Sequence, residues 1–175
     1  MDLKDYIRSI KDYPKKGILF RDITTLIKNE TAFEEAINQI VERSIKFKVD
    51  KIAAIESRGF VFASAVSYIL KKPFIMLRKK NKLPADVHSV DFELEYGTAT
   101  IEVHKDSISQ NDSVLIIDDL IATGGTADAA AKLIEISKGH VAAFIFVINL
   151  FDLGGCDNLK KKGYKVENLM EFPGH

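Results

Sequence analysis

Apolar residues occur in this chain as short runs that alternate with segments of helical periodicity. Runs rich in β-branched residues suit strands buried on both faces, whereas apolar positions three and four residues apart indicate one face of a helix. The pattern predicts strands at 51–55, 74–77, 114–117, 141–149 and 164–169, and helices at 32–47, at 59–70 and after Gly125. Because strands and helices alternate, we expect an α/β fold with a mostly parallel sheet flanked by helices.

The helix expected at 32–47 is preceded by a start signal. Thr31 and Glu34 have the spacing of a capping box, in which two side chains satisfy free N–H groups of the first turn. We therefore predict that Thr31 caps this helix.

Two segments depart from the alternation of strands and helices. Residues 92–103 alternate around Tyr96 and Gly97 like an antiparallel hairpin, and a polar stretch at 78–90 precedes them. Such an interruption is more typical of a working flap than of a structural need, so we predict a flap at about 79–103. We expect residues 1–30 to form an N-terminal hood over the sheet.

Length, composition and charge limit the remaining possibilities. The 175 residues are 46% hydrophobic and 29% charged, which fits one domain over 1–175. Lys plus Arg and Asp plus Glu both number 25, so the chain does not resemble a general nucleic-acid or anionic-membrane binder. The sequence has no apolar stretch of membrane-spanning length, and Cys156 is its single cysteine, which excludes an internal disulfide. We expect a cytoplasmic protein.

The segment from Val114 to Thr126, VLIIDDLIATGGT, carries the clearest chemical signal. Asp118 and Asp119 follow a buried-strand run, at the end where α/β sheets bind ligands. The loop Ala122 to Thr126 (Ala122, Thr123, Gly124, Gly125, Thr126) offers backbone N–H groups and hydroxyls, and both glycines allow positive φ.

A helix is expected to start at this loop, and its N-terminus favours a phosphate. Two carboxylates beside a phosphate make sense when the ligand also carries hydroxyls, so a ribose 5-phosphate with a metal ion is the predicted occupant. The alternative interpretation of this segment is purely structural: an Asp-rich turn and a glycine-containing loop after a strand. The loop fits neither a Walker A motif nor a dinucleotide fingerprint.

Two cationic groups could meet further anions. Glu56 to Gly59 closes one predicted strand, and Arg58 suits bidentate contact with a pyrophosphate, although an ordinary loop would look the same. Arg78 begins a run of four cations that includes Lys82. A solvated charge run is the usual interpretation of such a segment. Its position before the flap favours a phosphate contact instead.

Two further segments allow a functional and a structural interpretation. Gly17 to Thr25 contains Phe20 and Arg21, which could supply the apolar face and edge hydrogen bonds of a base pocket, or could simply anchor a strand. The residues alone do not decide between them. Glu95 and Tyr96 at the hairpin turn could close over a reacting sugar, or could be ordinary strand residues.

The run VLIIDDLIATGGT resembles the phosphoribosyl pyrophosphate motif of the type I phosphoribosyltransferase family. The motifs FRDIT, ESRGF, RKKNKLP, LEYG and DDLIATGGT, in this order, resemble the adenine-using branch of that family. The resemblance implies the type I phosphoribosyltransferase fold. It also implies transfer of ribose 5-phosphate from 5-phosphoribosyl 1-pyrophosphate (PRPP) to adenine, giving AMP and pyrophosphate in purine salvage. The chain departs from the family pattern at Asn81 and Ala85, where glycine is usual or frequent.

The same resemblance assigns roles to individual positions. Asp118 and Asp119 would hold the ribose hydroxyls, and Ala122 to Thr126 the 5-phosphate. The other assigned residues are Arg58, Arg78 and Lys82 for pyrophosphate, Phe20, Leu120 and the Arg21 backbone for adenine, and Glu95 with Tyr96 for the catalytic flap. Mg²⁺ would be held mainly through PRPP with no firm protein ligand, and the chain would form a homodimer in which Arg78 crosses the interface. Neither nucleic acid nor membrane is expected as a partner.

Two alternatives remain. One is a phosphoribosyltransferase for an oxopurine, because one or two edge hydrogen bonds set the choice of base and the sequence does not orient them. The other is a non-catalytic regulator that senses PRPP. A nucleic-acid-binding regulator would need a basic face or an added domain, and the sequence predicts neither.

Overall fold

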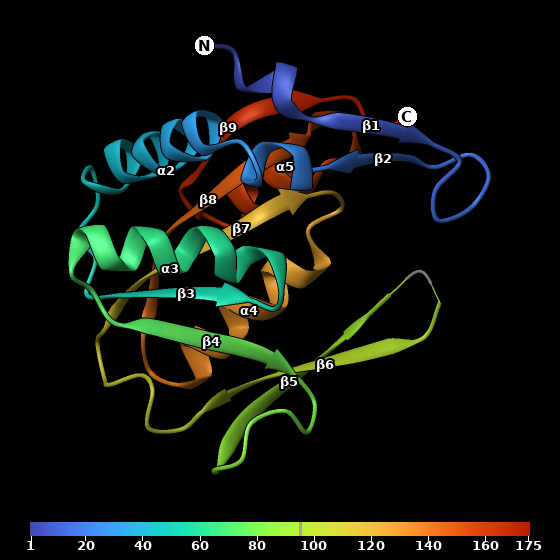
Figure 1. Ribbon diagram of the computed structural model, residues 1–175. Coiled ribbons are helices and arrows are strands. Elements are labelled where there is room, and N and C mark those ends of the chain that lie inside the picture. The colour runs from blue at the N-terminus through green and yellow to red at the C-terminus, as the bar shows by residue number, and fades with distance from the viewer. Residues whose placement is uncertain (95) are drawn as a thin grey trace.

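A seven-stranded sheet forms the centre of the computed structural model, which describes residues 1–94 and 96–175 (Figure 1). Its strand order is β5-β6-β4-β3-β7-β8-β9, and the β4-β3-β7-β8-β9 part is parallel throughout. The strands are β3 (Lys51–Ile55), β4 (Phe74–Lys79), β5 (Val87–Glu93), β6 (Thr98–His104), β7 (Ser113–Ile121), β8 (His140–Leu150) and β9 (Val166–Phe172). The predicted α/β class is confirmed.

Helices cover both faces of this sheet. Ile40 of α2 and Phe62 of α3 belong to the core on one face, and Leu133 of α4 and Leu159 of α5 to the core on the other. The helices are α1 (Thr24–Ile27), α2 (Glu30–Ser44), α3 (Arg58–Leu70), α4 (Gly125–Ile136) and α5 (Gly155–Lys161), with 3-10 turns η1 (Leu3–Tyr6) and η2 (Phe151–Leu153). Within the described residues, no helix combines the length and the apolar character that a bilayer crossing requires.

The start of α2 differs from its prediction. The helix begins at Glu30, and the Oδ1 atom of Asn29 accepts a hydrogen bond of 2.9 Å from the Ala32 N–H. Thr31 therefore lies inside the first turn and is not the cap, so the expected capping box is wrong. Asn29 has the extended backbone of an N-cap and a short side-chain acceptor, which makes it the better cap.

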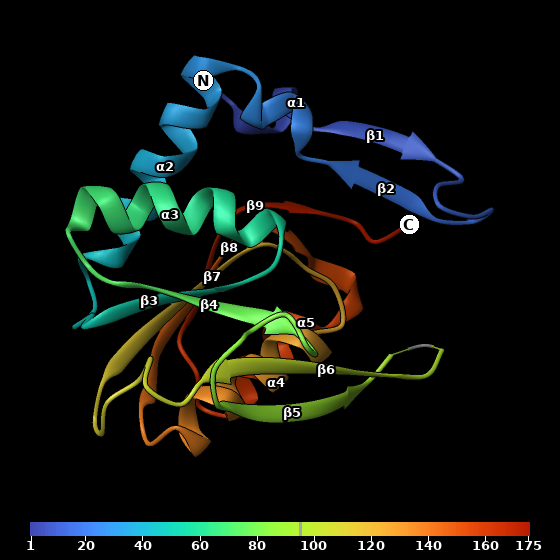
Figure 2. The same cartoon turned by 60° about the horizontal axis from the view of Figure 1, so that its bottom comes forward.

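The expected hairpin is confirmed and also extends the main sheet. β5 and β6 pair antiparallel along their length, and β6 pairs with β4 through Arg78 opposite Glu102 and Lys79 opposite Ile101. The base of the hairpin is thus part of the sheet, whereas its far end projects from the body of the molecule (Figures 1 and 2).

The N-terminal segment forms a small sheet of its own. β1 (Arg8–Lys11) and β2 (Leu19–Asp22) pair antiparallel and share no strand with the main sheet. In both ribbon views this hairpin lies above the carboxyl ends of the parallel strands, and the segment that follows β9 runs alongside it (Figures 1 and 2). Sequence analysis predicted a hood here but not its two-stranded form.

Candidate active site

The acid pair lies inside the central strand. Sequence analysis placed Asp118 and Asp119 after a strand that ended at Ile117, but β7 continues to Ile121 and pairs with β8 over that distance. The expected strand end is therefore wrong by four residues. β3 pairs with β7 as far as Ile117 and β8 pairs with it past the acids, so the sheet gives the two carboxylates a rigid support.

The loop after β7 has the predicted form of an anion cradle. Gly124 is the N-cap of α4 and has φ of +91°, a backbone conformation that glycine adopts without strain. Gly125, which also allows positive φ, does not adopt it, because it is the first residue of α4 and the chain is already helical there. No side chain among the described residues caps this helix. The N–H groups of its first turn are therefore available to an anion.

A glycine that sequence analysis missed supports this loop from behind. The Gly155 N–H donates a hydrogen bond of 3.1 Å to the Ala122 carbonyl. A Cβ atom at position 155 would lie 2.5 Å from the Ala122 oxygen and 3.0 Å from the Gly124 nitrogen. The two loops can lie this close only because position 155 has no side chain. No local motif around Gly155 could have indicated that contact, since the two loops are about thirty residues apart.

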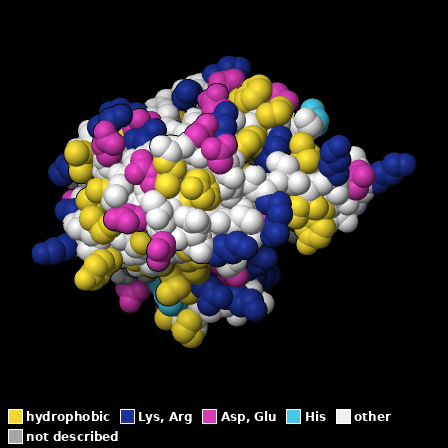
Figure 3. Space-filling view, turned by 45° about the horizontal axis from the view of Figure 1, so that its top comes forward, with side chains coloured by type: hydrophobic (Ala, Val, Ile, Leu, Met, Phe, Trp, Pro, Cys, Tyr) yellow, Lys and Arg dark blue, Asp and Glu magenta, His cyan; other side chains and the backbone are white. Residues whose placement is uncertain are grey.

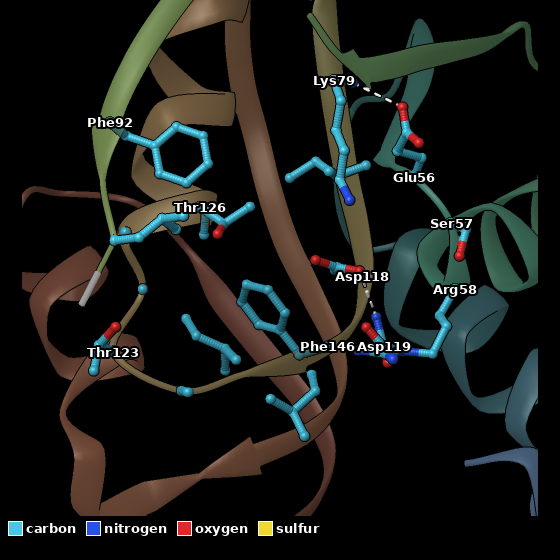
Figure 4. Close-up of a pocket in the computed structure, with 18 of the residues that line it drawn as sticks. Glu56, Ser57, Arg58, Lys79, Phe92, Asp118, Asp119, Thr123, Thr126 and Phe146 are labelled. Carbon is cyan, nitrogen blue, oxygen red and sulfur yellow. Dashed lines mark hydrogen bonds and ion pairs between the residues drawn. The ribbon is translucent and has the colours of Figure 1, made fainter. Parts of the chain in front are cut away.

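The acid pair, Arg58, Leu120 and the cradle surround one cavity of about 470 Å³ (Figure 4). Phe92 of β5 lies across this cavity from the acids, and Phe146 of β8 lines it from the sheet. Sequence analysis assigned no role to either phenylalanine or to Glu93. Their strand patterns look like ordinary core or hairpin positions, so only the tertiary structure could identify them. Among the described residues, the lining comprises Ile55, Glu56, Ser57, Arg58, Lys79, Phe92, Glu93, Leu94, Asp118 to Ala127 and Phe146.

The two acids differ in their partners. The Arg58 Nε donates a hydrogen bond of 2.6 Å to Asp119 Oδ2, and this nearby charge raises the pKa of the Arg58 guanidinium. Burial raises the pKa of Asp118 well above its ordinary value, and repulsion from Asp119 raises it further. Asp118 Oδ1 accepts a hydrogen bond of 2.9 Å from the Asp119 N–H. The site thus holds one paired carboxylate beside one that resists ionisation.

Gly59 explains how α3 approaches the acids so closely. A Cβ atom at this position would lie 2.8 Å from Asp118 Oδ1 and 3.3 Å from the Ile117 carbonyl oxygen. The φ of Gly59 is not positive, so close contact and not an unusual backbone favours glycine here. Its role is to leave room, since α3 starts at Arg58 and carries that guanidinium to Asp119.

The other expected pyrophosphate residues lie outside this cavity. The Arg78 Nε donates a hydrogen bond of 3.2 Å to Glu56, whose carboxylate also accepts the Lys79 N–H at 2.7 Å. Lys82 is exposed on the turn after β4. Asn81, which departs from the family pattern, has φ of +67°, a conformation that asparagine tolerates better than most residues.

Two of the three expected base residues, Phe20 and Arg21, line a second cavity of about 360 Å³ between the hood and α3, whereas Leu120 lines the first. Phe20 and Arg21 lie on this cavity together with Arg58, whose guanidinium carbon is 5.9 Å from the centre of the Phe20 ring. Arg58 also lines the first cavity, so this one side chain borders both. The Arg21 guanidinium points elsewhere and donates to the Pro173 carbonyl at 3.2 Å.

The predicted catalytic pair is only partly described. Glu95 lies outside the described residues. Tyr96 is 75% exposed, and the Nζ atom of Lys15, from the hood loop, lies 4.6 Å from the centre of its ring. The tip of the hairpin therefore reaches the hood loop across the mouth of the site.

The described residues do not form a metal centre of their own. They contain no group of three or more His, Cys, Asp or Glu side chains placed to hold an ion. Asp118 and Asp119 supply carboxylate oxygens beside the anion cradle. Such a pair suits Mg²⁺ that arrives with substrate phosphates, because Mg²⁺ usually keeps water and phosphate ligands beside one or two carboxylates.

The arrangement can bind an anion and hydroxyl groups at the same time. The start of α4 supplies N–H donors for a phosphate, and the β7 acids supply acceptors a short distance away. The second cavity adds an aromatic ring and backbone groups suited to a flat heterocycle. Both parts open toward the space under the hood and the hairpin.

Comparison with known proteins gives a consistent result. A family model described as phosphoribosyl transferase domain matches residues 22–168. The chain is 83% identical to an adenine phosphoribosyltransferase of Pelagibacter ubique over the full length of both chains. Among solved structures, an adenine phosphoribosyltransferase of Thermoanaerobacter pseudethanolicus superposes with a TM-score of 0.93 at 44% identity, covering 97% of this chain and 98% of that one. An enzyme of that name from Saccharomyces cerevisiae, solved with adenine, gives 0.88 at 33% identity, covering 96% of each chain.

Proposed function

This chain belongs to the phosphoribosyl transferase family, and we propose that it is an adenine phosphoribosyltransferase, which converts adenine and PRPP into AMP and pyrophosphate. Its full-length relatives of this name and its solved neighbours support the assignment. The observation that carries it is the placement of Asp118 and Asp119 beside the open N-terminus of α4 in one cavity. That geometry suits a sugar phosphate better than a bare phosphate or a base alone.

The donor is held through its ribose phosphate. The 5-phosphate lies in the cradle from Ala122 to Thr126, where backbone N–H groups and two threonine hydroxyls donate to it. The ribose 2′- and 3′-hydroxyls donate to Asp118 and Asp119. Because Arg58 already neutralises Asp119, the acid pair can lie close to a phosphorylated sugar.

The pyrophosphate leaves toward the cationic side of the site. Arg58 borders the cavity, and Arg78 and Lys82 lie on the strand and turn that flank it. In the free protein Arg78 pairs with Glu56, so its contact with pyrophosphate requires an exchange of partner. Mg²⁺ bound to the donor would be held mainly through its phosphates, with the β7 acids nearby, and would stabilise negative charge on the leaving group.

Adenine binds under the hood against Phe20, between that ring and Leu120, with edge hydrogen bonds from the Arg21 backbone. Its N9 atom attacks the anomeric carbon of the donor and the bond to pyrophosphate breaks, while N9 loses its proton. Positive charge develops on the sugar during this displacement. Glu95, which precedes Tyr96 in the sequence, is our assignment for electrostatic or acid-base support of that charge, and closure of the hairpin excludes water.

We further propose that the chain acts as a homodimer that buries the outer face of α3 and β4. Val61, Tyr68 and Met76 are 37%, 85% and 48% exposed on this face, which is a large apolar exposure for a surface helix and strand. Arg78 lies two residues beyond Met76, on the same side of β4. It is therefore well placed to meet the site of a second copy. Light scattering after gel filtration should give twice the monomer mass for the wild type. The Met76→Glu variant should give a mass closer to that of the monomer.

The test of the function is an assay with Mg²⁺, PRPP and each purine base in separate reactions, following nucleotide formation and pyrophosphate release. We expect AMP from adenine and little product from the oxopurines. Product from an oxopurine alone would show that the assigned base is wrong and that the transfer reaction is right. Donor binding without turnover for any base would contradict the enzyme and favour the sensor.

A further inference from the structure

The β1-β2 hairpin of the hood, which lies over the adenine cavity, contains no fully buried apolar side chain, although Leu3, Ile23 and Leu26 on either side of it are buried in the core. β1 and β2 pair over only four positions and share no strand with the main sheet. Three of the four β1 residues are exposed. An isolated two-stranded hairpin is marginally stable in water, so contacts from outside must fix the position of this one.

One such contact comes from the segment Phe172–Gly174, which comprises the last residue of β9 and the two residues after it. The Arg21 guanidinium donates to the Pro173 carbonyl at 3.2 Å, and its central carbon lies 4.6 Å from the centre of the Phe172 ring. The same guanidinium donates to Ser9 on β1 at 2.6 Å, so it joins both hood strands to this segment. Figure 2 shows the segment passing alongside β2.

The other end of the segment reaches the support of the phosphate cradle. The Gly174 N–H donates to Asp152 Oδ1 at 2.6 Å. A Cβ atom at position 174 would lie 2.7 Å from Leu153 Cγ, so the two loops are in close contact. Gly155, two residues after Leu153 in the chain, lies against Ala122 and Gly124 of the cradle.

A continuous path of contacts therefore runs from the hood to the phosphate cradle. We propose that Phe172–Gly174 is a connecting segment that holds the adenine hood at a fixed position relative to the cradle. The Arg21 side chain and Asp152 are then positioning residues at its two ends, in addition to the Arg21 backbone role already assigned. Loosening either end frees the hood and weakens adenine binding, while the donor keeps its own site. The inference rests on the proposed function only for its kinetic consequence.

The experiment loosens each end separately in the full chain. Arg21→Met removes the hood contact, and Asp152→Ala removes the acceptor for the Gly174 N–H. Asp152→Asn keeps an oxygen acceptor at that position and serves as the conservative rescue. Arg43→Met is the matched control, because Arg43 also donates to a backbone carbonyl, that of Gln39 at 3.1 Å, but on α2.

The first measurement is hydrogen exchange of residues 8–22 in the free protein, which needs no turnover. We expect Arg21→Met and Asp152→Ala each to speed exchange about three- to tenfold, as loss of one hydrogen bond or contact implies. Asp152→Asn and Arg43→Met should stay near wild type. Faster exchange with Arg21→Met but not with Asp152→Ala would overturn the proposal, because the contact between Gly174 and Asp152 would then have no part in fixing the hood. If Arg21→Met does not fold, the comparison of Asp152→Ala with Asp152→Asn tests the proposal by itself.

The second measurement is steady-state kinetics. We expect the KM for adenine to rise about three- to tenfold in both variants, with the KM for PRPP and kcat within twofold of wild type. The double variant should be no worse than the more affected single variant, because both break one path. A rise in the KM for PRPP alone, or an additive double effect, would contradict the proposal. Changed hood exchange in a protein without any turnover would overturn the proposed function and leave the connecting segment intact.

Discussion

The donor side and the base side of this site are built in different ways. The acids and the cradle come from one contiguous stretch, 113–126, which lies on the central strand β7 and the start of α4. The base side combines residues 8–22, Tyr96 at the end of the β5-β6 hairpin and the segment at the end of β9, which are distant in sequence and mostly exposed. The donor side is thus supported by the core, whereas the base side depends on a few separate contacts.

This difference has a functional consequence. A phosphate cradle benefits from rigidity, because its N–H donors must keep their geometry before the ligand arrives. A base cavity under a hood must open to admit adenine and then exclude water. The following predictions challenge or sharpen this division, and the expected effect decreases from one to the next.

The largest effect is expected on the donor side with Asp119→Asn. This variant removes the charge that accepts a ribose hydroxyl and that holds Arg58 at 2.6 Å. We expect kcat/KM for PRPP to fall about 100-fold or more, which is about the loss of two charge-assisted hydrogen bonds. Asp128→Asn is the control and should stay within about twofold, because Asp128 is half-buried in the first turn of α4 and pairs with Lys132 and Lys162 on the far side from the acids' partner Arg58. An equal loss in both variants would contradict the role of Asp119.

The next effect tests whether tertiary packing fixes the cradle. Gly155→Ala would force the new methyl group against the Ala122 oxygen, so we expect the KM for PRPP to rise on the order of tenfold. Gly125→Ala should have a smaller effect, although this residue lies in the motif, because its Cβ would be 3.8 Å from the Glu93 carbonyl. Donor titration of the two variants measures the difference. The reverse order would show that the local motif alone fixes the loop.

A third prediction concerns the stability of the donor side. Because the folded protein raises the pKa of Asp118, ionisation of this carboxyl destabilises the fold as pH rises above its unfolded value of about 4. Asp118→Asn removes that effect. We expect the variant to exceed wild type in free energy of unfolding by roughly 1 kcal/mol at pH 8 and by less at pH 5.

Urea unfolding of both proteins at the two pH values measures this difference. The change in wild-type stability between the two pH values also contains contributions from other titrating groups. The relevant quantity is therefore the difference in free energy of unfolding between the two proteins at each pH. A variant less stable than wild type at pH 8 would show that Asp118 is not penalised in the fold.

The smallest effect is expected where the hood loop meets the hairpin tip. The Lys15 ammonium over the Tyr96 ring is an exposed cation-π contact, worth about 0.5–1 kcal/mol. We expect Lys15→Met to lower kcat/KM about two- to fivefold, and Lys16→Met, its neighbour, to change it less. Initial-rate measurements at low salt would detect the difference. A loss as large as that of Asp119→Asn would mean that the base side is as tightly constrained as the donor side.

Much of the donor side was predictable because its determinants are local. A β-branched run, two acids, a glycine loop and a helix start follow one another within fourteen residues, and each requires its own residue type. The adjacent strands and helices were predicted correctly for the same reason. Errors arose at boundaries, where Asn29 competed with Thr31 for the helix cap and where pairing with β8 extended β7 past the acids.

The base side and the supporting contacts were decided by the tertiary structure. Phe92, Phe146 and Gly155 look ordinary in sequence, and they belong to the site only because the fold brings parts of β5, β8 and α5 to the carboxyl end of β7. The resemblance assigned only the Arg21 backbone to adenine, and the Arg21 side chain donates to Pro173, which is 152 residues away along the chain. The sequence by itself determined the fold class and the chemistry of the donor site, because hydrophobic periodicity and loop chemistry are local properties. Packing between distant segments decided how the hood, the hairpin and the cradle are held together, because a contact of that kind leaves no periodic pattern in the sequence.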